Sequence, residues 1–188
     1  MNHSQALIPQ LLRKSNSVSL KEGLAILLAS FLLAALAQVA IPLPFTPVPI
    51  TGQTFGVALL SLLMGRKLAG LTLLTYLAEG AIGLPVFSMG KSGLFFNPTS
   101  GYLLGMLCAT QVIGYFSDRG VRGSFLKTFL ACVMGSLTVF SFGLLGLLFF
   151  IPLNKVLIVG LFPFIAGDLV KNLCATSLFC AVNQTLKK

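Results

Sequence analysis

Long apolar stretches, separated by short polar or proline-rich segments, make up most of the chain after residue 22. Each stretch ends at a glycine, a proline or a group of charges, which are typical places for a helix to stop. A helix that crosses the hydrocarbon core of a bilayer needs about 20 residues, and somewhat shorter spans are tolerated. We therefore predict six membrane helices, over residues 23–41, 53–64, 68–82, 102–117, 128–151 and 163–184.

Two connections between these helices are long and rich in proline and glycine. The first runs from Pro42 to Thr51 and the second from Leu84 to Ser100. Non-helical backbone at membrane depth is tolerated only where protein or a water-filled cavity satisfies its polar groups. We therefore expect both connections to be ordered and to line such a cavity.

The composition supports a membrane protein. Of the 188 residues, 56% are hydrophobic and only 9% are charged, whereas soluble domains carry roughly 25% charged residues. The net charge of +9 does not indicate a nucleic-acid partner, because the basic residues lie in small groups between apolar runs instead of in one patch. The predicted fold class is an all-α integral membrane protein, with a polar tail over residues 1–22 and a single six-helix membrane domain over residues 23–188.

The basic residues also predict an orientation, because Lys and Arg concentrate in cytoplasmic segments. With the N-terminus inside, only Lys91 and Lys155 fall in outer loops, while Lys171 lies within the last helix. The inner segments then hold Arg13, Lys14, Lys21, Arg66, Lys67, Arg119, Arg122, Lys127, Lys187 and Lys188. Both termini are therefore predicted to be cytoplasmic, and the two irregular connections and the start of the last helix lie together on the outer side.

Asp168 and Lys171 are the sharpest chemical signal in the sequence. Ionisable residues inside an apolar helix are costly, and they usually face the bundle interior or a cavity. Three positions apart, the two side chains share one face of the helix. Lys171 would bind a ligand carboxylate, or Asp168 would accept hydrogen bonds from ligand N–H groups. The alternative is an ion pair with a structural role alone.

The two irregular connections add uncharged polar groups. Thr51 and Gln53 follow a run of prolines and could hydrogen-bond a neutral polar ligand. Asn97, Thr99 and Tyr102 precede the fourth predicted helix. Composition alone favours helix capping for Asn97 and Thr99, because such residues commonly cap helices.

Several classes of chemistry are disfavoured. The sequence has no GxxxxGK[ST] phosphate-binding loop, and its single histidine, His3, lies in the polar tail. Its four acidic residues are dispersed, and Cys108, Cys132, Cys174 and Cys180 lie in apolar runs without metal-site spacing. We therefore expect neither an enzyme nor a bound metal or cofactor, and any ATP-driven work requires a partner.

Four ordered motifs resemble the BioY family, the biotin-specific S components of energy-coupling factor (ECF) transporters. They are IPLPFTPVPITGQ over residues 41–53, YLAEGAIGLPVF over 76–87, NPTSGY over 97–102 and FPFIAGDLVK over 162–171. The resemblance implies a six-helix S component in a bacterial cytoplasmic membrane. It would bind biotin from the outer side and work with a membrane-embedded T component and two ATPase subunits.

The resemblance also implies roles for individual residues. The substrate-binding positions of the family fall on Asp168, Lys171, Thr51, Gln53, Asn97, Thr99 and Tyr102, with Phe45, Tyr76 and Phe87 lining the apolar part. Small residues on the first helix of the family form the docking surface for the T component. Here the candidates are Ala25, Ala29, Ser30 and Ala34, although small residues at this spacing also suit packing inside the bundle.

The chain departs from the family pattern at three positions. Asn97 and Ser100 stand where glycine is usual, and Glu79 stands where an apolar or small residue is usual. Glu79 could join the site, pair with Lys91 or reach interfacial water. The alternative function is a standalone secondary transporter or facilitator for biotin or another small carboxylate-bearing solute, but the sequence has no internal repeat and no second Asp/Lys pair.

Overall fold

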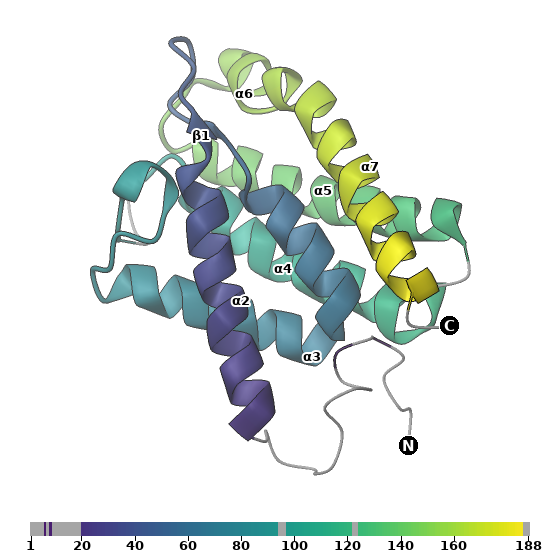
Figure 1. Cartoon of the computed structure of the whole chain (residues 1–188). Helices are drawn as coiled ribbons and strands as arrows, with labels where there is room; N and C mark the ends of the chain where they lie inside the picture. Colours follow the sequence, from purple (N-terminus) through teal and green to yellow (C-terminus); the bar gives the residue numbers. More distant parts are fainter. Residues whose placement is uncertain (1–5, 7, 9–19, 94–96, 122–123, 186–188) are drawn as a thin grey trace.

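The computed structural model describes residues 6, 8, 20–93, 97–121 and 124–185 (Figure 1). Long helices dominate, and two short strands form one small hairpin. In chain order the described elements are α2 (Leu20–Gln38), β1 (Ala40–Ile41), β2 (Ile50–Thr51), α3 (Gln53–Ala81), the 3-10 helix η1 (Ser88–Gly90), α4 (Ser100–Asp118), α5 (Phe125–Leu147), α6 (Leu153–Gly160) and α7 (Phe162–Thr185).

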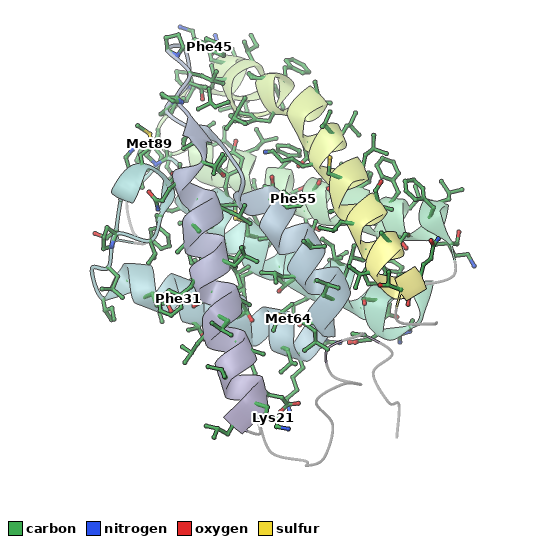
Figure 2. All side chains as sticks on the ribbon, in the orientation of Figure 1. Lys21, Phe31, Phe45, Phe55, Met64 and Met89 are labelled. Atoms are coloured by element: carbon green, nitrogen blue, oxygen red, sulfur yellow. The ribbon has the colours of Figure 1, made fainter. Side chains whose placement is uncertain are left out.

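Four described helical stretches are long and apolar enough to cross a membrane. They are Leu20–Gln38, Gln53–Ala81, Phe125–Leu147 and Leu153–Thr185, the last of which joins α6 and α7. Large apolar side chains such as Leu145 of α5 are exposed. Phe31 of α2 is also exposed and lies on the outside of the bundle (Figure 2). Such a surface is stable against lipid chains, which confirms the prediction of a helical membrane protein.

The predicted break between the second and third helical stretches is a kink inside α3. Gly65 has a φ of +70° and a ψ of −177°, which is not helical. A side chain would be strained there, and a Cβ would also collide with Asp118. The backbone N–H of Arg66 donates to Asp118 Oδ2 (3.1 Å), so a carboxylate from α4 holds the kink.

Close contact between α4 and α5 depends on glycine. A Cβ on Gly105 would lie 2.8 Å from the carbonyl oxygen of Val139, and Gly101 approaches the backbone of Gly146 in the same way. Glycines four positions apart let two membrane helices pack closely. Helix α4 lies between α3 and α5 (Figure 1). The neighbours of these glycines on α4, Tyr102, Leu103 and Met106, are therefore buried inside the bundle.

Some predicted boundaries were wrong. The first helix ends at Gln38 instead of residue 41, because Ala40 and Ile41 pair antiparallel with Thr51 and Ile50. The fifth helix is shifted to Phe125–Leu147, since Ser124 caps its start by accepting a hydrogen bond from the N–H of Lys127. The short helix α6 was not predicted, because its apolar residues merge with those of α7 in the sequence.

Candidate functional site

A cavity lies where the hairpin, the loop before α4 and the ends of several helices meet. The empty space between its walls is about 610 Å³, a volume that includes the part open to solvent. The described lining is Val48, Pro49, Thr51, Gln53, Thr54, Phe87, Ser88, Thr99, Tyr102, Leu103, Met106, Val139, Phe140, Phe164, Asp168 and Lys171. The cavity therefore combines an apolar wall with several polar groups and two ionisable ones.

A chain of hydrogen bonds supports the polar wall beside β2 and α3. Thr51 Oγ1 donates to Gln53 Oε1 (3.0 Å), and Gln53 Nε2 donates to the hydroxyl of Tyr76 (2.8 Å). Tyr76 in turn donates to the carbonyl oxygen of Val86 (3.0 Å). Tyr76 is buried behind the lining, and its ring meets that of Phe87 edge to face at 5.3 Å. Tyr76 thus orients Gln53 and Phe87, which themselves line the cavity.

The first turns of α7 supply the ionisable wall. Lys171 Nζ donates to Thr54 Oγ1 of α3 (3.2 Å), and Asp168 Oδ2 accepts from Asn172 Nδ2 (3.0 Å). Asn172 is buried and also donates to Ser136 Oγ of α5 (2.9 Å). Among the described contacts, Lys171 and Asp168 do not form a direct ion pair; each is held by a neutral partner. The structure therefore keeps both charges beside the cavity and leaves each with further hydrogen-bonding capacity.

The apolar wall comes chiefly from α4 and α5. Leu103 and Met106 extend along α4, and Val139 and Phe140 face them from α5. Tyr102 also belongs to this wall, but its hydroxyl donates to the carbonyl oxygen of Gly160 at the end of α6 (2.7 Å). Its ring therefore faces the cavity, while its polar group ties α4 to α6.

The structure brings seven of the ten proposed substrate-binding residues to the lining: Thr51, Gln53, Phe87, Thr99, Tyr102, Asp168 and Lys171. Tyr76 lies behind it. Phe45 is exposed at the tip of the hairpin (Figure 2) and lies outside the described lining. Asn97 lies outside the described lining, and its backbone N–H donates to Ser100 Oγ (3.3 Å). Thr99 makes no side-chain cap to the described backbone of α4, so the capping interpretation of this residue was wrong.

The small residues of α2 face the interior. Ala29 and Ser30 are buried, and Ala25 and Ala34 pack against the same core. This arrangement matches the alternative of packing inside the bundle. The exposed face of α2 instead carries Leu24, Leu27, Leu28, Phe31 and Leu32.

Glu79 belongs to α3, where its side chain meets α2, and it lies outside the described lining of the cavity. Ser30 Oγ donates to Glu79 Oε1 (2.7 Å), while Glu79 Oε2 is buried with no hydrogen-bond partner among the described residues. The carboxylate therefore joins two helices, an outcome that differs from each of the three possibilities drawn from the sequence.

Sequence reasoning missed several lining residues. Thr54 could have been found, since it follows Gln53 in the first turn of α3 and carries a hydroxyl. Ser88 lies in a loop with no distinctive motif. Val139 and Phe140 look like any other apolar residues of a membrane helix, and only their position opposite α4 brings them to the cavity.

Comparisons with known proteins agree with this geometry. The sequence model of the BioY family matches residues 12–188. A biotin transporter BioY of Rhizobium etli is 36% identical over 169 residues, which cover 85% of this chain and 90% of the relative. A biotin transporter BioY of Thermotoga maritima is 36% identical over 134 residues, which cover 70% of this chain and 78% of the relative.

A solved structure has the same fold. It is the crystal structure at 2.1 Å of the S-component for biotin from an ECF-type ABC transporter, with a TM-score of 0.82 and 27% sequence identity. The match covers 92% of this chain and 95% of the other. With the family match over residues 12–188, it follows that this chain belongs to the BioY family.

Proposed function

We propose that this chain binds biotin in the cavity and serves as the substrate-specific S component of an ECF transporter. The observation that carries the proposal is a largely apolar cavity that holds Asp168 and Lys171 in a member of the BioY family. Similar proteins are named biotin transporters, and the matched crystal structure is an S-component for biotin. A neutral apolar solute would have no use for a buried carboxylate and a half-buried lysine.

The chemistry of biotin suits the lining. Its ureido ring offers two N–H donors and one carbonyl acceptor, its valeryl chain is apolar, and its carboxylate favours a cation. In our proposal Lys171 binds the carboxylate and Asp168 accepts from the ureido N–H groups. The valeryl chain lies against Leu103 and Val139, and Thr51 and Gln53 offer further hydrogen bonds.

We also propose a topology of six membrane crossings with both termini in the cytoplasm. The crossings are α2, the two arms of α3 on either side of Gly65, α4, α5 and α7, within one membrane domain over residues 23–188 that follows a polar tail. The distribution of Lys and Arg supports this orientation. The cavity would then open to the outside, where biotin is captured.

Energy for uptake would come from partner subunits. The sequence has no phosphate-binding loop of its own. The proposed partners are a T component and two ATPase subunits, which match the kind of transporter named for the crystal structure. ATP would be hydrolysed by those subunits, and biotin is the only ligand proposed for this chain.

Equilibrium binding tests the proposal directly. The purified chain in detergent is titrated with biotin, with biotin methyl ester and with thiamine as an unrelated vitamin. Tight and selective binding of biotin is expected. Absence of biotin binding by a sample with a cooperative thermal transition would refute the proposed substrate.

A further inference from the structure

Gln38 joins α2 to the loop that carries part of the cavity wall. We call residues 84–93 the pocket loop. Gln38 Nε2 donates to the carbonyl oxygen of Phe87 (3.2 Å), and the backbone N–H of Gly90 donates to Gln38 Oε1 (3.0 Å). One side-chain amide therefore binds the backbone of the pocket loop at two places, three residues apart.

The other described anchors of the pocket loop come from α3. Tyr76 donates to Val86, and the backbone N–H of Gly93 donates to the carbonyl oxygen of Gly80 (2.9 Å). The Phe87 ring also packs so closely over Gly80 that a Cβ there would overlap it. The pocket loop is thus held from one side by α3 and from the other by Gln38.

The turn beside Gln38 has an unfavourable backbone. Met89 has a φ of +61° and Gly90 a φ of +70°. A non-glycine residue is uncommon in this left-handed region and persists where surrounding contacts hold it. Phe87 and Ser88, which directly precede this turn, line the cavity. A contact that holds the turn therefore also sets the position of two lining residues.

We propose that Gln38 is a positioning residue that keeps the pocket loop against the cavity and so slows the escape of bound ligand. The proposal rests on biotin binding at this cavity and adds a residue that does not itself line it. Because Gln38 lies in the last turn of α2, a shift of α2 relative to α3 would release the pocket loop. The end of α2 thus controls one wall of the site.

The test compares three variants of the full chain. Gln38→Met keeps the length of the side chain and removes both hydrogen bonds to the pocket loop, together with the one that Gln38 Nε2 donates to the Ala34 carbonyl oxygen of its own helix (3.2 Å). Gln38→Glu keeps the acceptor for Gly90 and places a carboxylate oxygen against the Phe87 carbonyl in place of the donor. Gln111→Met is the matched control, since Gln111 accepts a hydrogen bond from Arg66 Nε across two helices (3.0 Å) but lies outside the described lining.

The main readout is the rate at which biotin dissociates. For Gln38→Met we expect dissociation about fivefold faster, since one part-buried and one exposed hydrogen bond to the pocket loop are lost, with a smaller increase for Gln38→Glu. Gln111→Met should dissociate at the wild-type rate. The unfolding temperature of the ligand-free protein should change equally little in Gln38→Met and Gln111→Met. Faster dissociation in Gln38→Met alone would then reflect a displaced pocket loop and not a general loss of stability.

A second readout does not need biotin. Ser88 is buried, so a cysteine placed by Ser88→Cys should react slowly with a water-soluble thiol reagent, as measured at that position by mass spectrometry. Adding Gln38→Met, or Gln38→Glu if the first variant does not fold, should speed this reaction severalfold.

The outcomes are distinct. Wild-type dissociation and labelling rates in both Gln38 variants would overturn the role of Gln38, as would an equal change in Gln111→Met. Failure of the wild-type chain to bind biotin would overturn the proposed function instead, while the labelling rates would still decide whether Gln38 holds the pocket loop.

Discussion

Lys171 and Thr54, 117 positions apart in the sequence, meet at the cavity, where Lys171 Nζ donates a hydrogen bond of 3.2 Å to Thr54 Oγ1. This contact joins the third turn of α7 to the first turn of α3. It also replaces the ion pair that the spacing of Asp168 and Lys171 suggested. A hydroxyl leaves the lysine charge uncompensated by a direct partner, so a ligand carboxylate has more to gain by binding it.

The role of Lys171 can be tested by removing the charge from the protein and from the ligand in turn. Lys171→Ala should weaken biotin binding by about 10- to 100-fold, the usual range for a hydrogen bond to a charged group. Binding of biotin methyl ester should weaken much less, because the ester presents no carboxylate. Isothermal titration with both ligands measures the difference.

The matched control for this test is Lys155→Ala, which removes an exposed lysine of α6 outside the described lining. It should leave both affinities unchanged. An equal loss for acid and ester in Lys171→Ala would show that Lys171 does not bind the carboxylate.

Asn172 should matter for binding although it is buried behind the cavity. Asn172→Leu keeps a similar volume and removes the donor that holds Asp168 Oδ2. Because the Asp168 carboxylate is then no longer oriented, the affinity for biotin should fall about tenfold. Ser136→Ala, which removes a hydroxyl that contacts both Asn172 and Asp168, should weaken binding as well. Unchanged affinity in Asn172→Leu would show that Asp168 needs no such support, or that it does not contact biotin.

The hydroxyl of Tyr76 should contribute to both stability and binding. Tyr76→Phe leaves Gln53 Nε2 and the Val86 carbonyl without their partner, and unsatisfied buried groups cost about 1–3 kcal/mol. We expect a lower unfolding temperature and weaker biotin binding. Tyr115→Phe is the control, since Tyr115 is exposed on α4 and its ring contacts Arg119. Thermal unfolding in detergent and biotin titration check both effects; equal behaviour of the two variants would contradict the prediction.

Gly80→Ala should displace Phe87 from the cavity wall. The new Cβ would overlap Phe87 Cζ, so the ring must move. Biotin affinity should fall at least about tenfold, since overpacking and loss of a lining contact act together. Gly23→Ala is the control: it also adds a methyl group to a helix, but nothing lies within 4 Å of its Cβ. It should leave binding unchanged and slightly raise stability, because alanine favours helix more than glycine. Wild-type affinity in Gly80→Ala would contradict the packing described here.

Much of the fold was predictable because a membrane imposes simple rules. Apolar runs of bilayer length become helices, and prolines and glycines mark their ends, so the helical stretches and the break at Gly65 could be located from the pattern alone. The same logic identified Asp168 and Lys171, since ionisable residues in an apolar helix are too costly to retain without a role. These inferences depend on residue type and local order, which a sequence states directly.

The partners of those residues were decided by tertiary structure. No local pattern indicates that Lys171 meets Thr54, that Asp168 is held by Asn172, or that Ser30 donates to Glu79. The role of Gln38 is hidden in the same way, because a glutamine at the end of a helix looks like any polar residue near an interface. Hydrogen bonds between distant segments depend on how helices pack, and packing is set by the shapes of all the side chains together. The sequence alone therefore determined which groups are chemically unusual, while only the packed structure decided what they touch.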